Sequence, residues 1–371
     1  MTRQDIGGMK PRQKRADGSS NSPVTLRSVA DLVGLTPSTV SAVLNSSSAS
    51  HSVPPHTKKR ILAAARALDY RPNFFARSLR MKRSNMIGVI LEEIGDAYGS
   101  LVISGIERYL REQNVFFLTV AHRHDKKLLS TYSAVLRERG VEGFITVDTL
   151  LAEAPPLPTV AVAGHREIKG VTNVLLDHRH AAELALTHLV ELGHERIAFM
   201  KGAKVSADSE DRWNAICEVA AKLGVRMRTE LIVELKGDDP TPNLGYPFAR
   251  QLLDRKQPFT ALFAYNDISA IGSICAFHES GLRVPDDISV MGFDDIQNAA
   301  YISPPLTTIR QPLIKMGEIA ARTLLGRIGG TLKYVPEIAV EPELVVRRST
   351  APPCADRLRA SDRVRRLSVS S

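Results

Sequence analysis

Apolar residues near the N-terminus recur at the spacing of short amphipathic helices. Three such groups follow one another, and their members are Leu26, Val29, Ala30 and Val33, then Val40, Val43 and Leu44, then Ile61, Leu62, Ala65 and Leu68. Thr25 and Thr36 stand where a hydroxyl can cap the free N–H groups of the first two helices. Pro37 suits the first position of the second helix, because its missing N–H costs nothing there. The pattern therefore predicts a unit of three helices.

From Met86 the pattern changes to short apolar runs that alternate with helical segments. The runs MIGVIL, FFLTVA and GFITV read as strands, and LVISGIERYLREQ and LLSTYSAVLRERG between them read as amphipathic helices. The same alternation continues from TVAVAG to IKMGEIAARTLLGRI. It predicts right-handed βαβ units on parallel sheets, arranged as two similar α/β halves. A ligand crevice is then expected between the halves, at the carboxyl ends of the strands.

Length and composition agree with this division. The chain has 371 residues, 43% of them hydrophobic and 24% charged, which is typical of a globular protein with two or three domains. No apolar run reaches the roughly 20 residues of a membrane-spanning helix, and the N-terminus lacks the apolar segment of a signal peptide. We therefore expect a cytoplasmic chain with no membrane partner. Cys217, Cys275 and Cys354 are widely spaced, so neither a disulfide nor a zinc site is expected.

The positive charge is concentrated at the two ends of the chain. Residues 1–84 hold 15 Lys and Arg against 4 Asp and Glu, and residues 351–371 hold 5 against 2. The remaining body, residues 85–350, holds 29 against 34 and is mildly acidic. A basic first segment on an acidic body indicates a module that binds a polyanion such as DNA.

Several blocks of sequence resemble the LacI/GalR family of bacterial transcription repressors. VTLRSVADLVGLTPSTVSAVLN resembles the helix-turn-helix of that family, and RALDYRPNFFARSLR resembles the end of the same domain with its hinge helix. The resemblance continues through IGVI, HLVELGHERIAFMKG, FAYNDISAIG, ESGLRVPDDISVMGFDD and PPLTTIRQP, and covers about residues 24–348. Blocks in this order are far more specific than any one of them alone.

The resemblance implies an N-terminal all-α helix-turn-helix domain with a hinge helix. A C-terminal α/β domain of two lobes, like a periplasmic binding protein with two parallel-sheet, Rossmann-like subdomains, would follow it. The expected ranges are a disordered basic tail at 1–22, the DNA-binding domain at 23–71, the hinge at 72–84, the effector-binding and dimerisation domain at 85–348, and a second disordered basic tail at 349–371. Its N-subdomain would take about 85–177 plus 309–328, and its C-subdomain about 178–308 plus 331–348.

The function that the resemblance implies is transcriptional repression without enzymatic activity or cofactor, in the bacterial cytoplasm at the nucleoid. A homodimer would bind a near-palindromic, double-stranded DNA operator, with one reading domain in each of two successive major grooves. A small effector, a sugar or sugar derivative, would occupy the cleft between the lobes.

The first DNA-binding element is the second helix with its flanking residues. By resemblance its DNA-binding residues are Thr25, Thr36, Pro37, Ser38, Thr39, Ser41, Ala42 and Asn45. Ser38 can bond to a base edge and Ala42 can pack on a thymine methyl, but neither makes a bidentate contact. After Asn45 the loop is about three residues longer than the family pattern, so residues 46–52 are either flexible or alter backbone contacts.

The second DNA-binding element is the hinge. Its matching residues are Asn73, Ala76, Arg77, Leu79 and Arg80. In the family, paired hinge helices push a leucine into the minor groove, which kinks the DNA, and Leu79 matches that leucine. The alternative is that Leu79 is a core residue of a connecting helix.

Five residues match family positions that face the effector cleft: Asp96, Tyr98, Arg212, Asn266 and Asp294. Carboxylate, amide and guanidinium groups suit a ligand with several hydroxyls. Two structural alternatives stay open, since Asp294 can instead cap a helix and Arg212 can form a surface ion pair. Gly164 stands where many sugar-binding members carry an acidic residue, which leaves the identity of the sugar open.

Other classes of function fit less well. A dinucleotide-binding or kinase-type enzyme would need G-x-G-x-x-G after a strand or G-x-x-x-x-G-K-[ST], and neither is present. The histidine pairs His122/His124 and His178/His180 lack a defined set of metal ligands, so we interpret them as polar loop residues. A transport protein would have the lobes but no basic head. The remaining alternative is a sugar-binding protein or sensor without operator-specific regulation.

Overall fold

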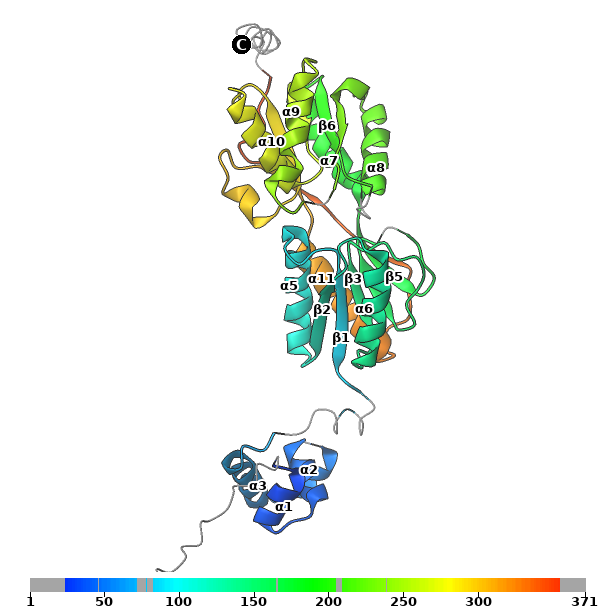
Figure 1. The fold of residues 1–371 in the computed structure, drawn as a ribbon, viewed down its shortest axis with the longest axis vertical. Helices are drawn as coiled ribbons and strands as arrows, with labels where there is room; N and C mark the ends of the chain where they lie inside the picture. The colour runs from blue at the N-terminus through cyan, green and yellow to red at the C-terminus, as the bar shows by residue number, and fades with distance from the viewer. Residues whose placement is uncertain are drawn as a thin grey trace, which may run out of the picture. The chain divides into compact units, whose positions relative to one another are not determined.

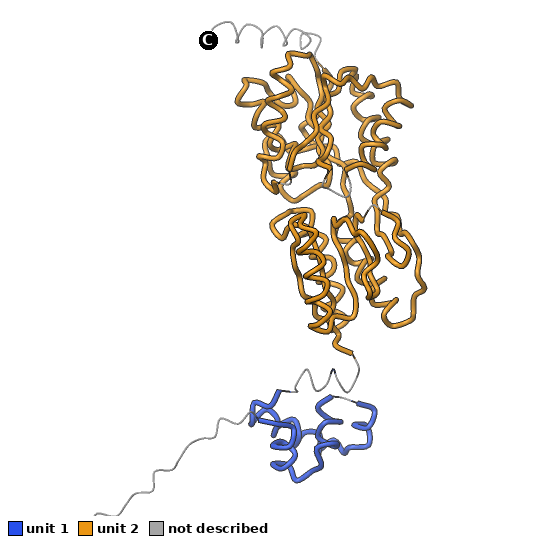
Figure 2. Tube along the Cα trace, turned by 45° about the vertical axis from the view of Figure 1, so that its right-hand side comes forward, with its two compact units in different colours: residues 1–82 blue, residues 83–371 orange. Residues whose placement is uncertain are grey.

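The structure is a computed structural model, and it describes residues 24–45, 47–71, 78, 83–164, 166–204, 209–237 and 239–353. The chain divides into two compact units, residues 1–82 and 83–371 (Figure 2). The hinge residues selected from the sequence, Asn73, Ala76, Arg77, Leu79 and Arg80, lie outside the described residues. The predicted N-terminal tail and residues 354–371 of the predicted C-terminal tail also lie outside them.

The first unit contains the three predicted helices, α1 (Leu26–Val33), α2 (Pro37–Leu44) and α3 (Pro55–Ala67), and a 3-10 helix η1 (Ser48–Ser52). One apolar side chain from each α-helix is fully buried: Val29, Val40 and Ile61. Burial of each such side chain contributes about 1.5–3 kcal/mol. Gly34 ends α1 with φ +66°, a left-handed conformation that favours glycine. This confirms the helical head that the sequence predicts.

The first lobe of the second unit contains a six-stranded parallel sheet in the order β11-β5-β4-β3-β1-β2 (Figure 1). Its strands are β1 (Met86–Leu91), β2 (Phe116–Ala121), β3 (Phe144–Val147), β4 (Thr159–Val162), β5 (Val171–Leu176) and β11 (Glu337–Val340). Its helices are α5 (Ala97–Glu112), α6 (Lys126–Glu138) and α11 (Leu313–Ile328).

Successive side chains of β1 point to opposite faces of the first sheet and pack against different helices on each face. Val89 and Leu91 belong to the apolar cluster that includes α5 and α11, whereas Ile90 packs with Leu136 of α6. Helices α5 and α11 lie side by side (Figure 1). A Cβ atom at Gly105 of α5 would overlap the backbone of Ile314, so glycine permits this close approach.

The second lobe contains the sheet β12-β10-β9-β8-β6-β7, parallel except for the antiparallel pair β10 and β12. Its strands are β6 (Ile197–Lys201), β7 (Ile232–Glu234), β8 (Ala261–Phe263), β9 (Ser289–Asp294), β10 (Thr307–Arg310) and β12 (Glu343–Val345). Its helices are α7 (His178–Glu191), α8 (Ser209–Lys222), α9 (Tyr246–Asp254) and α10 (Asp267–Glu279), with short 3-10 helices η2 (Thr229–Leu231), η3 (Pro242–Leu244) and η4 (Gln297–Ala300). Helices α7 and α8 pack together, as do α9 and α10 (Figure 1). The two predicted α/β lobes are thus confirmed.

Three boundaries differ from those that the sequence predicts. Strand β11 pairs with β5 in the first sheet, although the predicted ranges place residues 331–348 in the second lobe. Conversely, β10 pairs with β9 throughout, so residues 309 and 310 belong to the second lobe. The expected tail at 349 is wrong for its first residues, because the Ser349 hydroxyl is buried and donates a 2.6 Å hydrogen bond to the Val290 carbonyl. Within the described ranges, no helix combines the length and apolar character needed to cross a membrane.

Candidate functional site

The exposed surface at the start of α2 is formed by uncharged residues. The backbone N–H of Thr39 donates to Thr36 Oγ1 at 3.3 Å, and Pro37 occupies the first turn, which confirms the predicted helix start. Pro37 and Ser38 are exposed, whereas Ala42 is half-buried. Thr25 caps α1 in the same way, through the backbone N–H of Ser28 at 3.3 Å. The cap hydroxyls therefore hold both helix ends in place.

Ser41 and Asn45 contact each other at the end of α2. The Asn45 amide donates to the Ser41 carbonyl at 2.8 Å and to the Ser41 hydroxyl at 3.2 Å. Ser41 is also buried, so its hydroxyl supports the helix end rather than standing free. This internal bonding is a feature that the sequence pattern did not indicate.

The longer loop after α2 contains an ordered helical turn. Residues 48–52 form η1, which contacts α2, and Ser50 within it is buried. His51 is exposed, with Nδ1 3.1 Å from the Ser48 carbonyl oxygen. Arg60 of α3 donates to the Val33 carbonyl at 3.0 Å and so satisfies the end of α1. The longer loop therefore adds the ordered turn η1 to the folded surface of the head.

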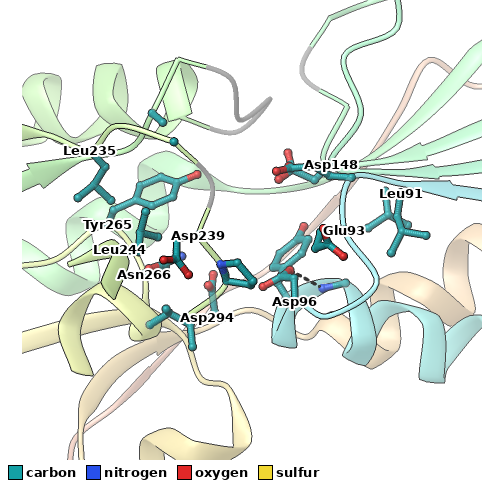
Figure 3. A pocket seen from close by; sticks show the side chains of 18 of the residues that line it. Leu91, Glu93, Asp96, Asp148, Leu235, Asp239, Leu244, Tyr265, Asn266 and Asp294 are labelled. Atoms are coloured by element: carbon teal, nitrogen blue, oxygen red, sulfur yellow. Dashed lines mark hydrogen bonds between the residues drawn. The ribbon is translucent and has the colours of Figure 1, made fainter. Parts of the chain in front are cut away.

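A pocket lies between the two lobes and encloses about 880 Å³, part of which is open solvent. All five cleft residues selected from the sequence line it: Asp96, Tyr98, Arg212, Asn266 and Asp294. In Figure 3, Glu93, Asp96 and Asp148 of the first lobe face Asp239, Asn266 and Asp294 of the second. The structure thus brings together residues that are far apart in the sequence, such as Asp96 and Asp294.

Two of these residues are positioned by capping a helix on opposite sides of the pocket. The backbone N–H of Gly99 donates to Asp96 Oδ2 at 2.9 Å, and that of Ser269 donates to Asn266 Oδ1 at 2.9 Å. Burial raises the pKa of Asp96, and the neighbouring Glu92 raises it further. The cap fixes the Asn266 oxygen and leaves its amide nitrogen as the group that can donate to a ligand.

Arg212 is buried in the second lobe, with 5% of its surface exposed. Its guanidinium carbon lies 3.8 Å from the centre of the Phe293 ring and 4.7 Å from that of Tyr265. Its Nη1 donates to the Tyr265 carbonyl at 2.8 Å. The alternative of a surface ion pair is therefore wrong, because the side chain is buried in the pocket wall.

Asp294 ends β9 and is 6% exposed. Its φ of +110° is rare for a residue other than glycine and is a local strain of the kind found at binding sites. Gln311 Nε2 donates to Asp294 Oδ1 at 2.7 Å. Burial raises the pKa of Asp294 well above its usual range, although Arg212 opposes the shift. Asp294 caps none of the described helices, so that alternative is wrong.

The sequence reasoning missed several acidic residues at the pocket. Glu92 and Glu93 follow β1, Asp148 follows β3, and Asp239 comes from the second lobe. The signal for the first three was present, since polar residues after parallel strands gather at one edge of a sheet.

Asp267 is a further missed residue. It is fully buried beside Asn266, and it accepts hydrogen bonds from the Thr308 hydroxyl at 2.6 Å and the Ile296 N–H at 2.8 Å. Through these bonds it joins the start of α10, the segment after Asp294 and strand β10. Burial raises the pKa of Asp267 to about 7.

The histidine pairs hold structural positions. His122 is buried with Nε2 3.1 Å from Thr149 Oγ1, and His124 contacts Glu92. His178 and His180 begin α7 rather than lying in a loop, and His180 Nδ1 is 2.8 Å from Glu341 Oε2. Among the described residues, no group of three or more potential ligands is placed to hold a metal ion.

Comparison with known families matches the helical head and part of the α/β body separately. The family described as "Bacterial regulatory proteins, lacI family" matches residues 25–73, and "Periplasmic binding protein-like domain" matches residues 186–350. The chain is 32% identical over 336 residues to the HTH-type transcriptional repressor PurR of Photorhabdus laumondii subsp. laumondii, covering 88% of this chain and 96% of the relative.

Two solved structures have a similar fold. The lac repressor dimer bound to operator and the anti-inducer ONPF is 27% identical with a TM-score of 0.80, covering 89% of this chain and 100% of that one. The CelR–cellobiose complex is 27% identical with a TM-score of 0.64, covering 88% and 99%. With the helical head, the two lobes and the pocket between them, these matches establish that the chain belongs to the lacI family of bacterial regulatory proteins.

Proposed function

We propose that this DNA-binding repressor acts as a homodimer on a near-palindromic operator, and that a ligand in the interlobe pocket controls its DNA affinity. The observation that carries the proposal is the pocket itself, which gathers Asp96, Arg212, Asn266 and Asp294 from two lobes. A separate helical head with an exposed α2 start supplies the reading element.

Recognition of the operator is shared between α2 and the hinge. Ser38 supplies a hydrogen bond and Ala42 an apolar contact, while Thr25, Thr36, Thr39 and Asn45 fix the docking of the helix on phosphates. Ser41, whose hydroxyl is buried, holds Asn45 at the end of the helix. In the hinge, Leu79 enters the minor groove, while Asn73, Ala76, Arg77 and Arg80 pack the paired helices and contact the backbone. Deformation of the operator centre then contributes to specificity.

An exposed apolar edge supports the dimer. Strand β2 lies at the edge of the first sheet, where Phe116 is 70% exposed and Leu118 is 39% exposed. Unpaired strand edges and exposed apolar side chains favour association with another chain. The similar lac repressor structure is itself a dimer on its operator.

The effector is a small ligand with several hydroxyls. Carboxylate and amide groups pair with hydroxyls, and the similar CelR structure is a complex with cellobiose. A sensor with no operator is the competing function, and it would need no paired reading heads.

The operator test is selection from random duplex DNA with the full chain, followed by footprinting. We expect two inverted half-sites separated by about one helical turn. A DNA-bending assay then compares the parent with Leu79→Ala, for which we expect a smaller bend. Binding without sequence preference would support the sensor instead, and an undiminished bend would remove Leu79 from the proposal.

The effector test measures operator affinity with and without the ligand found in a stability screen. Arg212→Ala and Asp294→Ala are each expected to abolish the ligand-induced change while the dimer stays intact. Asp254→Ala, an exposed site outside the pocket, serves as the matched control. A full ligand response in both pocket variants would contradict the proposed site.

A further inference from the structure

The charged side chains that line the interlobe pocket are predominantly acidic. Among the described residues that line it, six are carboxylates and Arg212 is the one cation. The carboxylates are Glu92, Glu93, Asp96, Asp148, Asp239 and Asp294. They come from both lobes, and Figure 3 shows the labelled ones on both sides of the same space.

Nearby cations offset this charge only in part. Arg123 Nε is 3.3 Å from Glu93 Oε2, but the Arg123 side chain is largely exposed, which weakens the pair. His124 pairs with Glu92. Even with both pairs counted, carboxylates outnumber these cations among the described residues at the pocket. Burial is the main cause of the raised pKa of Asp96, and the neighbouring Glu92 raises it further.

Arg212 is already committed to other groups. Its guanidinium stacks on Phe293, bonds to the Tyr265 carbonyl and acts electrostatically on Asp294. A ligand carboxylate or phosphate that reached for Arg212 would therefore compete with Asp294 and meet further carboxylates from the first lobe. The pocket is thus unfavourable for an anion and, by the same charges, favourable for a cation.

We propose that the effector carries a positive charge and belongs to the hydroxylated amines, the class that includes amino sugars. Its ammonium group would lie among the carboxylates, and its hydroxyls would bond to the remaining carboxylate oxygens and the Asn266 amide. Tyr98, which also lines the pocket, adds an aromatic side chain of the kind that attracts ammonium groups. This inference rests on the proposed function, since it concerns the same site.

The charge of the ligand also provides a mechanism of control. Carboxylates of the two lobes repel one another across the pocket, and this repulsion opposes the approach of the lobes. A cation between them replaces repulsion by attraction from both sides. Binding of the ammonium group then favours closure of the lobes, whereas a neutral analogue supplies hydrogen bonds alone.

The test uses matched compounds that differ in charge. Glucosamine, glucose and glucuronate form one set, and galactosamine, galactose and galacturonate form a second. Ethanolamine and ethylene glycol form a minimal pair. Each is added to the full chain in a thermal-shift screen, and compounds that raise the melting temperature are measured by calorimetric titration. We expect the ammonium compound of a set to bind roughly tenfold more tightly than its neutral partner, because hydrogen bonds to charged groups are the stronger ones.

Isosteric variants locate the effect. Asp148→Asn and Asp239→Asn each remove a pocket charge without changing the side-chain size, and each is expected to reduce the preference for the ammonium compound. Asp254→Asn, exposed and outside the pocket, should leave the preference unchanged. An unchanged preference in both pocket variants would place the cation elsewhere and overturn the proposal.

Tighter binding of a neutral or anionic member, or no stabilisation by any ammonium compound, would also overturn the charge proposal. The proposed function is judged separately. A neutral sugar whose binding disappears in Arg212→Ala would leave that function standing, and failure of operator selection would reject it whatever the ligand charge.

Discussion

Helix α2 of the helical head and the interlobe pocket differ in the charge of their side chains. Helix α2 contains no charged residue along its whole length, Pro37–Leu44. The pocket, in contrast, has six carboxylates and Arg212 among the described residues that line it. A neutral helix gains little from any one contact with DNA, so under the proposed function α2 would depend on its shape and on a second head in the dimer. The pocket depends instead on the balance of its charges.

The interiors of the two units differ in the same way. The head is packed around apolar side chains such as Val29, Val40 and Ile61, and among its described residues the buried polar groups are the hydroxyls of Ser41 and Ser50. The body, however, buries the carboxyl groups of Asp267 and Asp294. Loss of apolar packing should therefore unfold the head, whereas a change of pH should alter the stability of the body.

The largest expected effect comes from Val40→Asp. Val40 is fully buried in the head, and an unpaired carboxylate there should cost on the order of 5 kcal/mol, about the whole stability of so small a unit. We expect the head to unfold and operator binding to be lost. Calorimetry should still show the unfolding transition of the body at its usual temperature.

Leu32→Asp is the matched control, because Leu32 is 59% exposed and lies in the same unit. It should leave the head folded. If Val40→Asp also lowered the transition temperature of the body, the two units would not be independent, and the contrast between them would fail.

The next effect is a pH dependence carried by Asp267. The pKa of Asp267 is raised to about 7 in the folded protein, so between pH 4 and 7 the native state holds a proton that the unfolded state has released. The contribution of Asp267 to the free energy of unfolding therefore falls as pH rises from 4 to 7. From pH 5 to pH 8 the loss should be roughly 3 kcal/mol, at 1.36 kcal/mol for each pKa unit.

Asp267→Asn mimics the protonated form and should lack this loss. Denaturant unfolding of the body at pH 5 and pH 8 measures the difference between variant and parent. If the variant and the parent lost the same amount of stability between pH 5 and pH 8, Asp267 would not titrate in this range. The head, which buries no carboxyl group among its described residues, should show no such dependence.

How much the sequence predicted also differs between the two units. The head followed from apolar spacing, Thr25, Thr36 and Pro37, because helix starts depend on local side chains. The five pocket residues came from the family resemblance, and the structure places them all in one pocket. Asp267 and the partner of Asp294, Gln311, were missed, because their role arises from contacts between distant segments. For the same reason, pairing of β11 with β5 was not evident from the local pattern.

A smaller effect is expected from Thr36→Ala. Thr36 Oγ1 accepts the Thr39 N–H at the start of α2, and loss of such a cap costs about 1 kcal/mol. Thermal unfolding of the head should shift accordingly, whereas Thr36→Ser retains the acceptor and should restore most of the stability. Equal stability of Thr36→Ala and the parent would show that Pro37 alone fixes the helix start.

The smallest effect should come from Ser38→Ala, and it tests the neutral reading helix most directly. Ser38 is exposed, and its hydroxyl lies 2.9 Å from that of Thr36, so it can accept from Thr36 and donate to a base at the same time. A neutral hydrogen bond contributes about 0.5–1.5 kcal/mol, and we therefore expect operator binding to weaken by less than roughly tenfold for each half-site. Fluorescence anisotropy with the selected operator and with a shuffled duplex measures this, with Ser52→Ala as an exposed hydroxyl control outside α2. A hundredfold loss on the operator alone would mean that α2 reads bases mainly through Ser38. Equal loss on both duplexes would instead assign Ser38 to the phosphate backbone and leave sequence recognition to Ala42, the hinge and the spacing of the two heads.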